Sequence, residues 1–234
     1  MIFIYGKGTA KTLAREMGIK RIRPPSSREW DDEGDVCICY GYVPYNLPFQ
    51  SLNLNLIGDK EKELVKLQLG GLPTPQFVSA GGLARSRHHA GGGDLLRETG
   101  SDYMVERLNL TKEYRFHVFN FPTTEPQSVR AGTKVPRTPN PHPWIRSYEG
   151  GCKIDYGKPP ITNSSASRAL AERALEVVGY DFGAVDIGIK EDGNPVVLEV
   201  NSAPGLEGNS LLTYAKSLNR LMMEKGYIDD ESHL

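Results

Sequence analysis

The stretch that most constrains the fold is "AVDIGIKEDGNPVVLEVNSAPG", residues 184–205. Two runs rich in β-branched residues, 185–189 and 196–200, flank the turn-forming sequence "EDGNP". Such runs on either side of a short Asp-Gly turn are typical of a β-hairpin. We therefore expect two antiparallel strands joined by a tight turn.

The expected register of this hairpin places two acidic side chains side by side. A turn centred on Asp192 and Gly193 pairs Asp186 directly with Glu199. Because successive side chains point to opposite faces of a strand, Asp186, Glu199 and Asn201 share one face. The other face is wholly apolar and is expected to be buried; it comprises Val185, Ile187, Ile189, Val196, Leu198 and Val200.

The paired carboxylates indicate a cation site. Like charges placed directly opposite each other are destabilising, by about 0.2–1 kcal/mol for a cross-strand pair. A cation between them would turn this repulsion into attraction, and two carboxylates with an amide oxygen suit Mg²⁺ or Mn²⁺ better than zinc. The alternative is a solvated sheet face. The small-residue loop 202–205 that follows favours the site, because it brings backbone amides and a tight turn to the carboxylates.

The start of the chain predicts a small α/β unit. A short apolar strand at 2–5 is followed by a helix at 10–17, with Thr9 as a plausible N-cap. A second strand at 35–42 is rich in residues that suit a buried parallel sheet. The strand–helix–strand order indicates an α/β subdomain that extends to about residue 57.

The remaining chain alternates between helix and strand patterns. Further helices are predicted at 60–69, 163–178 and 210–225, and strands at 76–78, 103–107 and 114–121. In the first of these helices we expect Leu64, Leu67 and Leu69 to face a core. Residues 122–143 are rich in Pro and Thr without periodicity and predict a mobile loop.

The segment "FIYGKGTAKTLA" at 3–14 resembles a phosphate-binding loop only superficially. The P-loop pattern G-x-x-x-x-G-K-[ST], placed on Lys11 and Thr12, requires glycine at positions 5 and 10. The chain has Tyr5 and Ala10 there. We therefore expect any nucleotide site to lie elsewhere, and any role of this loop to concern the carboxylate end of a substrate.

Composition excludes some classes of partner. Among 234 residues, 28 basic and 29 acidic side chains give a formal net charge of −1, which provides no electrostatic case for nucleic acid or a membrane as the main partner. No apolar run is long enough to span a bilayer, and the first residues lack signal-peptide features. Cys37 and Cys39 are too close on one strand to pair, so we expect buried free thiols in a cytoplasmic protein.

The sequences "FGAVDIGI" and "VVLEVNSAPGLEG" resemble the ATP-grasp superfamily, and are most similar to the branch that ligates glutamate to ribosomal protein or other peptide carboxylates. The resemblance covers most of the chain between Gly58 and Ser210. It implies an α/β (α+β) ATP-grasp fold, in which two α+β subdomains clasp ATP between two sheets. The implied divisions are a small N-terminal α/β subdomain at 1–57, a subdomain with a Gly-rich loop at 58–110, and a subdomain with the metal-binding hairpin at 111–234.

The resemblance also implies roles for individual residues. Asp186, Glu199 and Asn201 would bind one or two Mg²⁺ ions that bridge the phosphates of ATP. In "VERLNLTKEYRF", Glu106 would lie at the adenine and Glu113 at the ribose. The basic residues that would neutralise the γ-phosphate and the reaction centre are Arg115, Lys134 and Arg146.

One departure from the family pattern concerns the phosphate-binding loop. The family usually has a lysine at the end of the strand before this loop, whereas "LARSRHHAGGGD" offers Arg85 or Arg87. Arginine binds phosphate well through its planar fork of donors, although with a different geometry. Backbone amides of a glycine run can cover phosphates, and the run here consists of Gly91, Gly92 and Gly93; the alternative for this stretch is a disordered surface loop.

The resemblance implies an ADP-forming ligase that activates a carboxylate as an acylphosphate and joins it to an amine, on an amino acid or peptide, with ATP and Mg²⁺ (or Mn²⁺). One alternative is a phosphotransferase on the same scaffold. Another is a non-catalytic nucleotide-binding module, which the retention of all three metal positions opposes. The carboxylate, the amine and the oligomeric state are not determined by the sequence.

Overall fold

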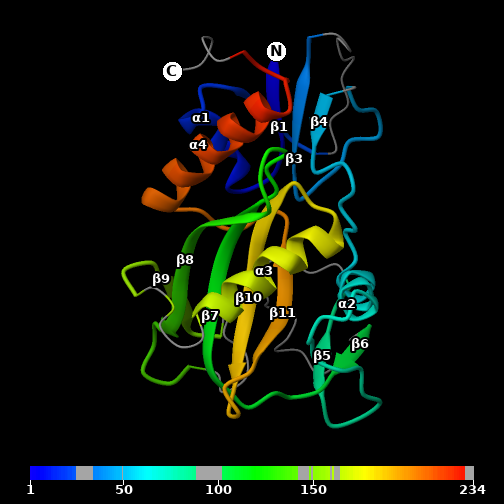
Figure 1. Ribbon diagram of the computed structural model, residues 1–234, viewed down its shortest axis with the longest axis vertical. Coiled ribbons are helices and arrows are strands. Elements are labelled where there is room, and N and C mark those ends of the chain that lie inside the picture. The colour runs from blue at the N-terminus through cyan, green and yellow to red at the C-terminus, as the bar shows by residue number, and fades with distance from the viewer. Residues whose placement is uncertain are drawn as a thin grey trace.

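The computed structural model describes residues 1–24, 34–48, 50–87, 102–141, 148, 150–158, 160 and 164–229. Figure 1 shows its arrangement, with an N-terminal sheet and two helices at one end, a central sheet below them, and a small helix-and-strand unit beside the central sheet. Gly91, Gly92, Gly93 and Arg146 lie outside the described residues.

The N-terminal sheet is parallel, as expected. Its strand order is β2-β1-β3-β4, and both β1 and β3 are wholly buried. Helix α1 begins at Ala10 as expected, although the Thr9 side chain makes no capping hydrogen bond. The elements are β1 (Ile2–Gly6), α1 (Ala10–Glu16), β2 (Lys20–Ile22), β3 (Val36–Tyr40) and β4 (Gln50–Leu52).

The central sheet has five antiparallel strands in the order β11-β10-β7-β8-β9. Helix α3 (Ser164–Val178) covers one face, where apolar side chains of the helix and of β7, β10 and β11 form a continuous core. The strands are β7 (Leu110–Phe119), β8 (Gln127–Pro136), β9 (Cys152–Asp155), β10 (Phe182–Lys190) and β11 (Pro195–Asn201).

Strand β8 corrects the prediction of a structureless loop over 122–143. It pairs with β7 on one side and with β9 on the other, so its backbone is held in a ladder along most of its length. Most of its side chains are half-buried, and its sequence lacks an apolar alternation. The strand is therefore fixed by its neighbours and not by a pattern of its own.

The β10–β11 hairpin has Asp186 directly opposite Glu199, which confirms the predicted pairing. The route to this register differs from the expected one. A turn closed between Lys190 and Asn194, with Gly193 at φ +83°, gives a register one residue away, and a bulge at Leu198 restores it.

The bulge also corrects one predicted face. Val197, and not Val196 or Leu198, joins the apolar core under α3 together with Val185, Ile187, Ile189 and Val200. An extra residue on one strand reverses the alternation of the side chains beyond it, which the strict two-residue period did not include.

The small unit beside the central sheet consists of α2 (Lys60–Leu69), β5 (Leu83–Arg85) and β6 (Tyr103–Val105). The limits of α2 are as predicted. Leu64 and Leu67 are buried, whereas Leu69 is 84% exposed, so its expected core position is wrong. The predicted strand at 76–78 is reduced to one bridge between Phe77 and Val105.

The C-terminal helix α4 (Asn209–Glu224) returns to the N-terminal sheet. Leu211, Leu218 and Leu221 share a core with Leu13 of α1 and Ile4 of β1. Figure 1 shows α4 beside α1, at the end of the molecule where the N-terminus lies. The subdomain limits at residues 57 and 110 remain a prediction, but the first and last parts of the chain share one core.

All three cysteines are buried and free, which confirms that prediction. Within the described ranges, no helix combines the length and the apolar character that a membrane crossing requires.

Candidate active site

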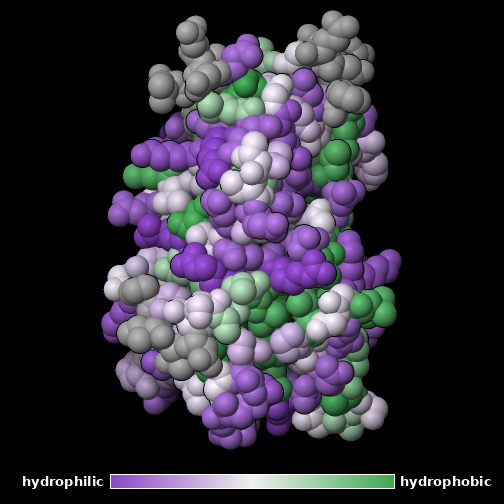
Figure 2. Space-filling view, in the orientation of Figure 1, coloured by the Kyte–Doolittle hydropathy of each residue, from purple (hydrophilic) through white to green (hydrophobic). Residues whose placement is uncertain are grey.

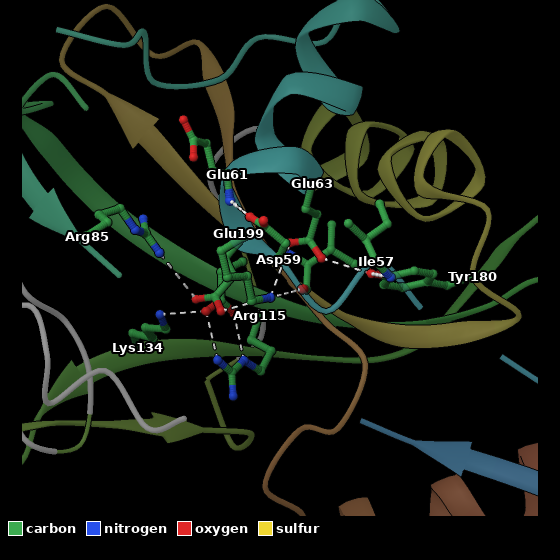
Figure 3. A network of polar contacts seen from close by, with 12 residues as sticks. Ile57, Asp59, Glu61, Glu63, Arg85, Arg115, Lys134, Tyr180 and Glu199 are labelled. Carbon is green, nitrogen blue, oxygen red and sulfur yellow. Dashed lines mark hydrogen bonds and ion pairs between the residues drawn. The ribbon is translucent and has the colours of Figure 1, made fainter. Parts of the chain in front are cut away.

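Charged side chains gather on the face of the central sheet that points away from α3. The odd-numbered residues of β10 lie under α3, so Asp186 projects to the opposite face. Arg115 on β7 is the cross-strand partner of Asp186, and Figure 3 shows Arg115 and Lys134 converging on the same carboxylate cluster. Three neighbouring strands, β7, β8 and β10, therefore supply one charged centre.

Asp186 is held by two cations. Arg115 donates from Nε to Oδ1 at 2.6 Å and from Nη2 to Oδ2 at 2.7 Å, which is a two-pronged pairing. Lys134 Nζ lies 2.9 Å from Oδ2 and also contacts Glu113 Oε1. The Asp186 side chain is only 3% exposed, so these bonds replace water.

The charges of this centre set its protonation. Burial by itself would raise the pKa of Asp186, but the positive charges and hydrogen bonds of Arg115 and Lys134 outweigh burial and lower it. Burial would lower the pKa of Lys134, yet Asp186 and Glu113 raise it. Asp186, Arg115 and Lys134 are therefore all ionised at neutral pH.

Glu199 has a separate set of partners from the small unit. Lys60 Nζ lies 3.2 Å from Oε1, and Arg85 Nη2 lies 3.8 Å from Oε2. Figure 3 shows Arg85 reaching Glu199 from the side opposite α2. Of the two arginines that the sequence offered, Arg85 is thus the one that reaches the hairpin, while Arg87 pairs with Glu61 on α2.

Helix α2 contributes two residues that the sequence reasoning missed. Lys60 also lies 3.2 Å from Glu63 Oε1 and donates to the carbonyl oxygen of Val200. Glu63 is buried and accepts hydrogen bonds from Val200 N and from the hydroxyl of Tyr180, at 3.2 and 3.1 Å. Burial raises the pKa of Glu63, against the opposing charge of Lys60.

A sequence signal for these two residues exists. Lys60 and Glu63 lie on the same helical face as Leu64 and Leu67, at spacings of three, four and seven residues. Charged residues on the inward face of an amphipathic helix need partners across the interface. Asp59 caps the same turn by accepting from the backbone amides of Glu61 and Lys62.

The donor set fits a hard metal ion. Asp186 and Glu199 are adjacent, and Asn201 follows on the same face with its buried Nδ2 unpartnered among the described residues. Within that part of the chain, no group of three or more His, Cys, Asp or Glu is placed to hold a metal. A metal here would therefore rely on the carboxylate pair, the Asn201 amide oxygen and oxygen atoms of a ligand, as Mg²⁺ does in phosphate sites.

The loop at 202–205 is fastened to the end of the N-terminal sheet. Tyr40 donates a hydrogen bond to the carbonyl oxygen of Pro204. A Cβ atom at Gly41 would lie 2.7 Å from Cβ of Ala203, so glycine permits the close approach of the two segments. The loop that follows the hairpin is thus in direct contact with the end of the N-terminal sheet.

Two further predicted residues lie in different surroundings. Glu113 is buried beside Lys134, whereas Glu106 follows β6 and accepts a hydrogen bond from Gln76 N at 2.9 Å. These two carboxylates therefore have different partners, an ion pair for Glu113 and a backbone amide for Glu106. Their predicted roles at the ribose and the adenine remain predictions.

The surface around α3 is mostly hydrophilic. Figure 2 shows that hydrophilic residues cover most of this face and that hydrophobic ones gather in limited areas. A shallow depression near the hairpin turn is lined by none of the predicted site residues; its lining is Pro73, Ala166, Leu170, Lys190, Asn194 and Pro195.

No protein-family model matches the chain. Short segments resemble curated proteins: the chain is 49% identical over 45 residues to the D-alanine–D-alanine ligase of Paraburkholderia phytofirmans. It is 48% identical over 50 residues to a "Probable alpha-L-glutamate ligase" of Vibrio parahaemolyticus. These matches cover 19% and 21% of this chain and only 14% and 16% of the lengths of those two proteins.

Solved structures match over almost the whole chain. The ATP-grasp ligase PsnB, in complex with a minimal precursor, gives a TM-score of 0.60 at 14% identity and covers 95% of this chain and 98% of its own. The D-alanine–D-alanine ligase of Bacillus anthracis gives a TM-score of 0.62 at 12% identity, over 97% of this chain and 95% of its own. At these identities the likeness shows a common fold.

Proposed function

The chain has the ATP-grasp fold, and on that premise we propose that it is an ATP-dependent ligase that joins a carboxylate to an amine and forms ADP and phosphate. The observation that carries the proposal is the convergence of Asp186, Glu199, Arg115 and Lys134 on one face of the central sheet. Fold alone does not determine activity; a centre that combines carboxylates suited to a metal ion with fixed cations supports phosphate chemistry in particular.

The charge balance of the centre supports this chemistry. Asp186, Glu113, Glu199 and Glu63 are matched by four cationic side chains, those of Arg115, Lys134, Lys60 and Arg85. If Asp186 and Glu199 held a metal ion, Arg115 and Arg85, which pair with these two carboxylates, would become available to the negative oxygens of a nucleotide. Lys134 and Lys60 would keep Glu113 and Glu63 as partners.

The proposed reaction has two steps. A carboxylate oxygen attacks the γ-phosphorus of ATP, the bond to the ADP oxygen breaks with its electron pair, and an acylphosphate forms. The lone pair of an amine then attacks the acyl carbon, the carbonyl π electrons move to oxygen, and their return expels phosphate while the amine loses a proton. Arg115 and Lys134 would neutralise the charge that develops on the transferring phosphoryl group and on the tetrahedral oxygen.

Asp186, Glu199 and Asn201 would hold Mg²⁺ in this scheme. The ion would supply positive charge to the phosphate oxygens of the nucleotide. The nucleotide itself would be bound by three other residues. Arg85 would meet the phosphates beside Glu199, and Glu106 and Glu113 would contact the nucleoside.

The local relatives named as D-alanine and glutamate ligases support an amino acid or a peptide as substrate. A solved PsnB structure contains a precursor peptide together with AMPPNP, which supports a peptide in particular. The alternative of a phosphotransferase uses the same centre and differs only in the acceptor, and nothing in the described geometry favours it.

The test is an ATP-dependent condensation screen. Purified protein with Mg-ATP and pairs of amino acids and short peptides should release ADP and form a product lighter by one water than the sum of its parts, detected by mass spectrometry. Glu199→Gln serves as the matched inactive control. A phosphorylated acceptor without condensation would support the phosphotransferase, and the absence of thermal stabilisation by Mg-AMPPNP at millimolar concentration would contradict nucleotide binding.

A further inference from the structure

Strand β11 is an edge of the central sheet, and α2 covers it beside the proposed metal ligands. Val200 lies between Glu199 and Asn201 and is completely buried. Its N–H donates to Glu63 Oε1 at 3.2 Å, and its carbonyl oxygen accepts from Lys60 Nζ. A buried edge strand needs partners for its outward backbone groups. Lys60 and Glu63, here called the α2 pair, supply both partners at the residue that joins the two ligands.

Glu63 is held in place by several donors. Besides Val200 N, Lys60 Nζ lies 3.2 Å from Oε1, and the hydroxyl of Tyr180 donates to Oε2 at 3.1 Å. The Tyr180 oxygen accepts in turn from Ile57 N at 3.1 Å, so its proton is directed to Glu63. Figure 3 shows this path from Ile57 through Tyr180 to Glu63. Because each of these partners of Glu63 donates, the side chain serves as an ionised carboxylate, which only accepts.

Lys60 is shared between Glu63 and the proposed metal site. Its Nζ lies 3.2 Å from Glu63 Oε1 and 3.2 Å from Glu199 Oε1. An ammonium group at Glu199 competes with a metal ion, because both are attracted by the same negative charge. Glu63 is the more buried of the two carboxylates, with 6% of its side chain exposed against 19% for Glu199. Glu63 therefore keeps a counter-ion for Lys60 when Glu199 turns to a metal ion.

The same arrangement occurs on α3, at a strand residue that flanks none of the predicted ligands. Arg168 Nη1 donates to the carbonyl oxygen of Ser128 at 2.7 Å, and Glu172 Oε1 accepts from Ser128 N at 2.8 Å. Ser128 lies near the start of β8. Arg168 and Glu172, here called the α3 pair, thus join a helix to a strand by the same kinds of bond as the α2 pair. They provide a control in which the structural role is separate from the metal.

We propose that Glu63 is a positioning residue for the metal site of the hairpin, supported by Tyr180. It fixes the backbone between Glu199 and Asn201, and it retains Lys60 so that the oxygens of Glu199 can bind a metal ion. This inference rests on the proposed ligase function, which assigns the metal to this hairpin. Residues that orient metal ligands in this way usually contribute about 10- to 100-fold to metal affinity.

The first test needs neither metal nor nucleotide. Amide hydrogen exchange of Val200 in the ¹⁵N-labelled full chain, followed by NMR, reports on its bond to Glu63. Glu63→Gln keeps an oxygen for this bond and should retain the protection, whereas Glu63→Leu should speed exchange about tenfold, because the acceptor is lost. Glu172→Leu should speed exchange of Ser128 and leave Val200 unchanged. A Val200 amide that exchanges as fast in wild type as in Glu63→Leu would overturn the proposal.

The second test is isothermal titration of the full chain with Mn-AMPPNP. Glu63→Gln should weaken the affinity by about 10- to 100-fold, because Lys60 is then left to compete for Glu199. Glu172→Gln, the same chemical change in the α3 pair, should leave the affinity unchanged. Tyr180→Phe should weaken it less than Glu63→Gln does, since Glu63 keeps its charge and its bond to Val200.

The outcomes of this titration separate the two proposals. Wild-type protein that does not bind Mn-AMPPNP would contradict the proposed function itself. If wild type binds and Glu63→Gln binds equally well, only the role of Glu63 is overturned. Equal losses in Glu63→Gln and Glu172→Gln would also overturn that role, because the effect would then be a general consequence of loosening a helix from the sheet.

Discussion

The two carboxylates of the hairpin lie directly opposite each other, yet their partners come from different parts of the chain. The cations around Asp186, Arg115 and Lys134, belong to strands of the same sheet. Those around Glu199 come from helix α2 and strand β5. The first half of the centre is therefore formed within one sheet, whereas the second half forms only where two separate units meet.

This difference allows the contribution of each carboxylate to stability to be separated from its contribution to turnover. Asp186 is 3% exposed and fixed by a sheet ladder on both sides, so its position depends on the fold of the central sheet. Glu199 is 19% exposed and depends on how the small unit lies against the hairpin. We expect Asp186 to dominate stability and both residues to matter equally for turnover.

The largest effect is expected for Asp186→Asn. The change leaves Arg115 without its counter-ion in a buried site, which typically costs about 3–5 kcal/mol. Urea unfolding should show this loss in the free energy of unfolding, and ATP turnover should fall by more than about 10³-fold. A variant with wild-type stability would contradict the view that the sheet half of the centre is fixed by this pair.

Glu199→Gln should abolish turnover to a similar degree but cost only about 1–2 kcal/mol of stability, because Lys60 keeps Glu63 as a partner and the site is partly solvated. The same urea and turnover measurements apply. Equal stability losses for Glu199→Gln and Asp186→Asn would remove the distinction between the two halves.

The pH dependence of stability tests the contribution of Asp186 separately. The pKa of Asp186 is lowered in the folded protein, so its contribution is present above the unfolded value of about 3.9 and is lost as the pH falls toward the folded value. Between about pH 5 and pH 2, Asp186→Asn should therefore lose stability less steeply than wild type, by up to about 1.4 kcal/mol per pH unit. Thermal denaturation across this range measures the slope.

Glu63→Gln is the matched control for that experiment. The folded pKa of Glu63 is raised, so its contribution is present below the unfolded value and declines as the pH rises, which is the opposite sign. Its removal should not flatten the acid slope. If both variants flatten it equally, the acid dependence belongs to some other carboxylate.

How far the sequence predicted this molecule depended on whether each feature was local. The helix limits of α2, the parallel pairing of β1 with β3 and the opposition of Asp186 and Glu199 all follow from local patterns. The pairing of Asp186 with Glu199 was predicted correctly because two differences cancel. The turn shifts the register by one residue, and the bulge at Leu198 shifts it back. A period of two residues cannot reveal either one.

What the sequence did not reveal was long-range. Strand β8 has no apolar alternation, and only its ladder with β7 and β9 makes it a strand. Lys60 and Glu63 precede Glu199 by more than 130 residues, so their contact with the hairpin required the packing of α2.

The smallest effect on nucleotide affinity is expected for a change at Lys11, which follows the glycine-containing turn after β1. Lys11 lies exposed on α1, a helix of seven residues at the N-terminal sheet, whereas Lys134 is buried against Asp186. Lys11→Met should leave the affinity for Mg-AMPPNP within about twofold of wild type, while Lys134→Met, the same chemical change, should weaken it by tenfold or more, since a buried charge-assisted contact contributes about 1.5–3 kcal/mol. Isothermal titration would measure both. A large loss for Lys11→Met would place the nucleotide at the P-loop-like segment and away from the hairpin, because Lys11 lies on α1 beside the N-terminal sheet and Lys134 lies on β8 of the central sheet.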